Sequence, residues 1–283
     1  MSQGWNLIGN HPDYPSNGSY KLTASFNVKN FTRPIPEFTG DFNGNCETLD
    51  ELPCCLIDKL SGNGIVQNIN LNNVDTRDAK CDPAVANTMN DKSIVRFIKI
   101  ANSQFKGVGS YFEEDDRAVK RNAIGMVSNV MWGESSFDHV MIANSTLNGT
   151  GVECVGGVVG AAYNNVNENF NVIIVNINIT GLGQEAHVGG VAGKMRNVRI
   201  KEVYIDNTIV KVAGQEGYGG GVAGASSDSS IQNVTIIDSS ISGRYAGGIV
   251  GFSWSNKVST CHVIRAKVNG EYCRWGDRIW CKR

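Results

Sequence analysis

The chain has 283 residues, with 26 Lys plus Arg against 27 Asp plus Glu, so its formal net charge is −1 at pH 7. Without a basic excess it is not expected to bind nucleic acid through bulk charge, because such binding depends on displaced counterions. No apolar run reaches the length of a membrane span, and the 19% of charged residues is too low for a typical disordered chain.

The two ends of the chain suggest caps. Residues 1–60 are predicted to form an N-terminal cap and a first coil. Residues 271–283 are predicted to form a C-terminal cap, which a disulfide between Cys273 and Cys281 could close; reduced cysteines are the open alternative. The first five residues contain neither a basic nor an apolar segment, so no cleavable signal peptide is expected.

An internal repeat dominates the sequence between these ends. The pattern of apolar, polar and Gly positions from Ile231 to Gly243 recurs with starts at residues 66, 95, 137, 169, 200, 231 and 258. Each copy alternates β-branched and polar residues with period two, as a half-buried strand does. Most copies are followed by a phrase such as Gly189-Gly-Val-Ala-Gly193, which predicts a second, short strand between tight corners.

One column of the repeat tests whether the copies stack. The seventh position reads Asn73, Asn102, Asn144, Asn176, Asn207, Asp238 and Arg265. Asn in register predicts a ladder in which each amide bonds its neighbour about 4.8 Å away in the next layer. We therefore predict an all-β fold: a single parallel β-solenoid (β-helix) of roughly seven coils over residues 61–270, with capped ends.

Several phrases now suggest a family. The segments 20–28, 36–45 and 65–73 resemble the opening of GLUG-motif β-solenoids, and the Gly-Gly-Val-Ala-Gly phrases resemble the motif that names this group. The group includes non-catalytic repeat regions of bacterial IgA1-specific metallopeptidases and related surface or secreted proteins. The resemblance covers about residues 20–270 and implies the fold but almost nothing about activity. The zinc motif His-Glu-x-x-His is absent, so neither a metal nor a cofactor is expected.

A second column offers a candidate catalytic site. Counting back from each Gly-Gly phrase places Asn122, Cys154, His187, Tyr218 and Tyr245 in one line. Cys154 and His187 would then lie on adjacent coils, where an imidazole can activate a thiol for acyl transfer. Such a dyad suits a thiol protease or a glutamine deamidase, and Asn122, Glu153 or Glu185 could orient the ring.

The same column has a purely structural interpretation. Cys154 is also a suitable small core residue, and His187 could cap a turn. Tyr218 and Tyr245 could form an ordinary aromatic stack, or they could contact a ligand if their rings are exposed. Which of these holds depends on the face that Cys154 occupies, because a slip of one residue moves a strand side chain from core to solvent.

The longest interval between copies, 42 residues, contains an acidic run followed by basic residues. Insertions in solenoids form loops that project from one face and often bind partners. The candidate binding residues there are Glu114, Asp115, Asp116 and Arg117, with a solvated bulge as the alternative.

Two functions follow as hypotheses. The first is a secreted bacterial solenoid, a virulence-type or surface module that binds a host or cell-surface protein or glycan, as a monomer and without nucleic acid. The alternative is a secreted toxin or effector enzyme, delivered into a host cell, that uses the Cys154–His187 dyad.

Overall fold

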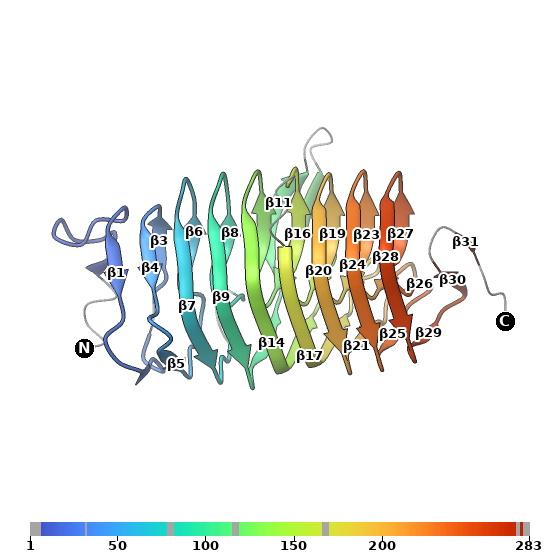
Figure 1. Cartoon of the computed structure of the whole chain (residues 1–283), viewed down its shortest axis with the longest axis horizontal. Coiled ribbons are helices and arrows are strands. Elements are labelled where there is room, and N and C mark those ends of the chain that lie inside the picture. Colours follow the sequence, from blue (N-terminus) through green and yellow to red (C-terminus); the bar gives the residue numbers. More distant parts are fainter. Residues whose placement is uncertain are drawn as a thin grey trace.

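The computed structural model describes residues 7–31, 33–77, 82–114, 119–165, 170–275 and 278–279. The regular elements of these residues are strands, and they wind through about seven coils along one axis (Figure 1). Within a coil the chain passes through three sheets, and from coil to coil the strands pair in parallel. This confirms the predicted all-β parallel solenoid.

Sheet 1 is the largest of the three, with 15 described strands. Its main path consists of β1 (Ser19–Lys21), β4 (Asp41–Asn43), β7 (Ile65–Asn72), β9 (Ile94–Ala101), β14 (Ser136–Gly149), β17 (Phe170–Gly181), β20 (Arg199–Asp206), β24 (Ser230–Ile237) and β28 (Lys257–Ile264). Beside this path lie β2 (Phe26–Asn27), β5 (Thr48–Asp50), β10 (Gln104–Gly107), β21 (Ile209–Val212), β25 (Ser240–Ser242) and β29 (Lys267–Asn269).

Sheets 2 and 3 each contain eight described strands. Sheet 2 consists of β11 (Ser110–Glu114), β12 (Val119–Gly125), β15 (Cys154–Gly156), β18 (His187–Gly189), β22 (Tyr218–Gly220), β26 (Tyr245–Gly247), β30 (Tyr272–Trp275) and β31 (Arg278–Ile279). Sheet 3 consists of β3 (Ile35–Phe38), β6 (Ile57–Leu60), β8 (Ala86–Met89), β13 (Ser128–Trp132), β16 (Val159–Tyr163), β19 (Ala192–Arg196), β23 (Ala223–Ser227) and β27 (Val250–Trp254).

The core lies inside the coils and is built from columns of identical register. One column runs through Ile98, Val140, Val172 and Val203, which are paired across β9, β14, β17 and β20 and at most 2% exposed. Each such side chain gains about 1.5–3 kcal/mol on burial. A coil in isolation would leave this face in water, so the coils stabilise one another.

Close contact between sheets 2 and 3 explains the repeated Gly phrase. A Cβ atom on Gly193 would lie 2.3 Å from the backbone nitrogen of Val155, and one on Gly224 equally close to that of Val188. These glycines are therefore required where the backbones of the two sheets meet.

The predicted polar ladder is present from Asn102 to Asn207 and lies at a corner of the coil, whereas Asn102 itself donates to Asn72 and not to Asn73. The Nδ2 atom of Asn176 donates to Oδ1 of Asn144 at 2.7 Å, and that of Asn207 donates to Asn176 at 3.3 Å. Arg265 continues the column with a bidentate pair to Asp238 at 2.6 and 2.7 Å. The seven positions have φ between 46° and 55°, the left-handed region that Asn tolerates well. The column thus serves both as a ladder and as a turn.

The cysteines are in different states. Cys46, Cys54 and Cys261 are free thiols, whereas Cys55 is disulfide-bonded. Cys281 lies outside the described residues, so its predicted bridge to Cys273 stays a prediction. The described residues include no helix long and apolar enough to cross a membrane.

Candidate functional site

The line of residues that contains Cys154 and His187 lies on sheet 2. Cys154 pairs with His187 in register, as predicted, and the column continues through Tyr218, Tyr245 and Tyr272. On the other side Cys154 pairs with Ala123, so the placement of Asn122 in this column was wrong by one residue. The error arose because the first copy of the phrase, Ile124-Gly125-Met126, lacks the second Gly from which the others were counted.

Cys154 has no exposed surface. Its side chain belongs to a small apolar cluster between sheets 2 and 3, together with Phe112, Ala123, Val130, Ala161 and Tyr163. A thiol in this position is shielded from solvent and from any substrate. The burial agrees with the structural interpretation of Cys154; the catalytic dyad itself is not tested by it and stays a prediction.

The residues proposed to orient the imidazole have other contacts. Nδ2 of Asn122 donates to the carbonyl oxygens of Val108 and Gly151, at 2.9 and 3.0 Å, and its Oδ1 accepts the backbone N–H of Glu153. The carboxylate of Glu153 pairs with Arg121 at 2.5 Å. These contacts account for the positions of both side chains without giving either of them a catalytic role.

His187 is instead the first ring of an aromatic stack. Its ring lies 5.1 Å from that of Tyr218 at an interplanar angle of 19°. Tyr218 and Tyr245 follow at 4.8 Å and 14°, and Tyr245 and Tyr272 at 5.0 Å and 13°. Burial raises the pKa of Tyr218, and the neighbouring Tyr245 and Glu216 add to this effect. The first three rings are half-buried, and Tyr272 ends the stack at 46% exposure.

A charged cluster borders this stack. The guanidinium of Arg244 lies 5.6 Å from the centre of the Tyr245 ring and pairs with Glu216 and Glu271. Each partner comes from an adjacent coil, so the three side chains form a short charged row beside the rings. Aromatic rings beside hydrogen-bonding groups form a surface suited to recognition.

Sheet 3 adds exposed aromatic rings that are not among the binding residues predicted above. Phe252 and Trp254 are 46% and 67% exposed, and Phe252 contacts the ring of Tyr218 edge-on at 5.6 Å. Trp254 falls in the register column of Trp132 and Tyr163. This column could have been found by extending the alignment three residues beyond each Gly phrase.

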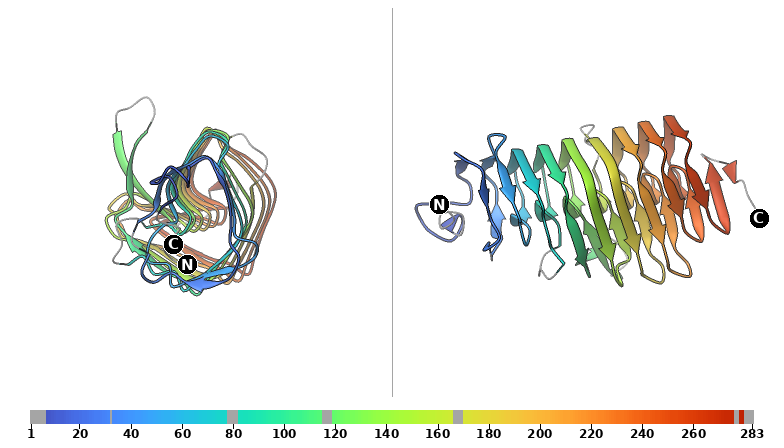
Figure 2. Two further views of the ribbon diagram at one scale, coloured as in Figure 1. Left: turned by 90° about the vertical axis from the view of Figure 1, so that its left-hand side faces the viewer. Right: turned by 90° about the horizontal axis from the view of Figure 1, so that it is seen from below.

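The long interval forms a projecting hairpin. Strands β11 and β12 pair antiparallel, with Glu113 opposite Lys120, and the hairpin extends beyond the outline of the coils (Figure 2). The projection of this insertion is confirmed. Glu114 ends β11, whereas Asp115, Asp116 and Arg117 lie outside the described residues, so their binding role stays a prediction.

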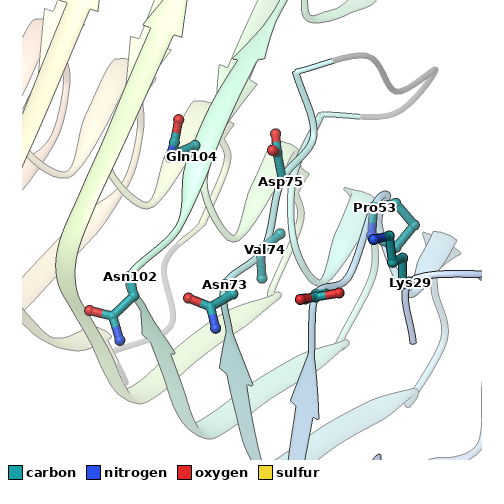
Figure 3. Close-up of a pocket in the computed structure, with 8 residues that line it drawn as sticks. Lys29, Pro53, Asn73, Val74, Asp75, Asn102 and Gln104 are labelled. Carbon is teal, nitrogen blue, oxygen red and sulfur yellow. The ribbon is translucent and has the colours of Figure 1, made fainter. Parts of the chain in front are cut away.

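A polar pocket of about 550 Å³ lies at the ladder corner (Figure 3). Its polar lining consists of Lys29, Glu51, Asn73, Asp75, Asn102 and Gln104. Structural contacts already engage several of these groups: Asn73 donates to Asp50, Asn102 donates to Asn72, and Asp75 pairs with Arg77. The polar groups that line the pocket thus mainly stabilise the ladder corner.

Comparison with known proteins supports the fold. A solved structure described as a "putative immunoglobulin A1 protease" from Bacteroides ovatus is similar over 98% of this chain and 77% of its own, with a TM-score of 0.52 and 14% identity. At this identity the likeness shows the β-solenoid fold alone. No family model matches the chain, and no curated protein matches it. Membership of the GLUG group is therefore not shown.

Proposed function

We propose that this chain is a bacterial β-solenoid protein that acts outside the producing cell as a binding module for a cell-surface protein or glycan. The observation that carries the proposal is the aromatic surface on neighbouring coils formed by the exposed rings of Tyr272, Phe252 and Trp254, beside the half-buried Tyr245. Large rings left in water on a rigid scaffold are typical of recognition surfaces. The likeness to the Bacteroides ovatus structure supports a bacterial origin.

The enzymatic alternative has one observation in its favour, the register that pairs Cys154 with His187. It requires a substrate to reach a thiol that the cluster of sheets 2 and 3 covers completely. Binding requires no such rearrangement, because the rings are already at the surface. The aromatic surface therefore supports binding better than catalysis.

The test is binding of the fluorescently labelled chain to intact animal cells, measured by flow cytometry. The double variant Phe252→Ala, Trp254→Ala should lose most of the binding, since both exposed rings are removed. Tyr204→Ala is a matched control, because this tyrosine is 38% exposed on a different sheet. Pretreating the cells with a protease or with glycosidases distinguishes a protein partner from a glycan. Unchanged binding of the double variant would contradict the proposal.

A further inference from the structure

The outer residues of sheet 3 form a column of planar side chains with one interruption. Backbone pairing places Trp132, Tyr163, Arg196, Ser227 and Trp254 in register on five successive coils. The rings of Trp132 and Tyr163 stack with centres 4.7 Å apart at 23°. Ser227 is the one member of these five without a planar group.

The interruption has the thickness of one ring. Successive strands lie about 4.8 Å apart, so Arg196 and Trp254 are separated by about 9.6 Å. A planar group above Ser227 would be about 4.8 Å from each, the spacing at which Trp132 and Tyr163 already stack. Ala225, two residues earlier on the same face of this strand, is 5% exposed, whereas Ser227 is half-buried and Trp254 is 67% exposed.

The chain itself shows what kind of group this column accepts. Phe112, which belongs to the projecting β11–β12 hairpin and not to the coil, packs against the rings of Tyr163 and Trp132 with centres 5.5 and 6.3 Å apart. A segment outside the coil thus already places an aromatic side chain against the column, about 8% exposed. At this end of the column the neighbouring group is thus an aromatic residue on an extended strand, with its ring inclined to the two rings at 50° and 72°.

We propose that the position above Ser227 receives an aromatic side chain of a partner polypeptide, sandwiched between the guanidinium of Arg196 and the indole of Trp254. This inference rests on the proposed binding function and narrows its partner to a protein. A guanidinium stacks through its faces and donates hydrogen bonds at its edge, so its polar contacts do not prevent stacking. The indole of Trp254 supplies the second face. Most of this ring is in contact with water when no partner is bound, since Trp254 is 67% exposed.

The test uses the full chain and two acetylated pentapeptides that differ at the central residue, Gly-Gly-Tyr-Gly-Gly and Gly-Gly-Leu-Gly-Gly. Titrations followed by saturation-transfer NMR should show at least tenfold tighter binding of the tyrosine peptide. Ser227→Phe fills the interruption from within and should weaken that binding at least tenfold, as should Trp254→Ala. Ser227→Ala should leave it within twofold.

Thr235→Phe is the matched control, because it adds the same ring in the same coil on the outer face of β24. It should bind the tyrosine peptide within twofold of the unaltered chain. Equal binding of the two peptides, full binding by a folded Ser227→Phe variant, or competition by a neutral disaccharide would each overturn the inference.

The two proposals can fail separately. If Ser227→Phe still binds cells as well as the unaltered chain, the binding function stands and the sandwiched ring is wrong. If the tyrosine peptide binds as predicted but no cell binding is found, the proposed function fails and the site above Ser227 remains.

Discussion

The buried carboxylate of Asp82 predicts an unusual dependence of stability on pH. Asp82 is 6% exposed, and its Oδ2 accepts the backbone N–H of Gly109 at 3.0 Å. Burial raises its pKa from 3.8 to about 6, although the hydrogen bond from Gly109 acts in the opposite direction. The folded chain therefore holds the Asp82 proton more tightly than the unfolded chain does.

The sign of the effect follows from proton binding. Between about pH 4 and pH 6 the folded state binds more protons at Asp82, so stability falls as the pH rises through this window. A shift of about 2 pKa units corresponds to about 3 kcal/mol, and partial solvent screening reduces this to about 2 kcal/mol. Asp82→Asn keeps a side-chain oxygen for Gly109 and removes the charge. At pH 8 it should be the more stable protein by about 2 kcal/mol.

The assay is urea unfolding of both proteins from pH 4.5 to 8, with the difference in unfolding free energy plotted against pH. Changes from all other titrating groups cancel in this difference. Thr76→Val is the control: the Thr76 hydroxyl donates to the Asp82 backbone carbonyl at 2.8 Å, and its loss should cost the same free energy at every pH. A difference for Asp82→Asn that is flat, or largest at pH 4.5, would refute the reasoning.

The remaining predictions concern strain, the ladder and the buried thiol. Thr260 has φ 54°, unfavourable for a β-branched residue, so Thr260→Asn should raise the unfolding free energy by about 1 kcal/mol in urea titrations; a loss would contradict the strain argument. Asn176→Ala should cost about 2 kcal/mol, because it removes two ladder bonds and leaves at φ 55° a residue without the amide that lets Asn tolerate the left-handed region, while Asn176→Gly should recover part of this loss. Cys154 should resist alkylation until the chain unfolds, both in the unaltered chain and in His187→Ala, with labelling measured by mass spectrometry. Rapid labelling of Cys154 near pH 6 that His187→Ala slows would instead support the catalytic dyad.

Repetition explains why the solenoid could be predicted from one sequence. The spacing of the copies places equivalent residues on successive coils, and parallel pairing then turns each sequence column into a line in space. The Asn ladder and the pairing of Cys154 with His187 followed from this rule alone. The rule failed where a copy is degenerate, as at Asn122, because counting then began from the wrong residue.

The environment of a side chain also depends on contacts between sheets. A column of the repeat gives the register of successive coils but does not show these contacts. The burial of Cys154 was decided by the side chains that surround it, from sheet 3 and from Phe112 of the β11–β12 hairpin. The raised pKa of Asp82 likewise depends on burial beside Gly109, 27 residues away. Periodic local preferences thus determined the coil, its register and its polar corner. Burial, stacking and exposure were decided by tertiary structure, because they depend on which surfaces exclude water from one another.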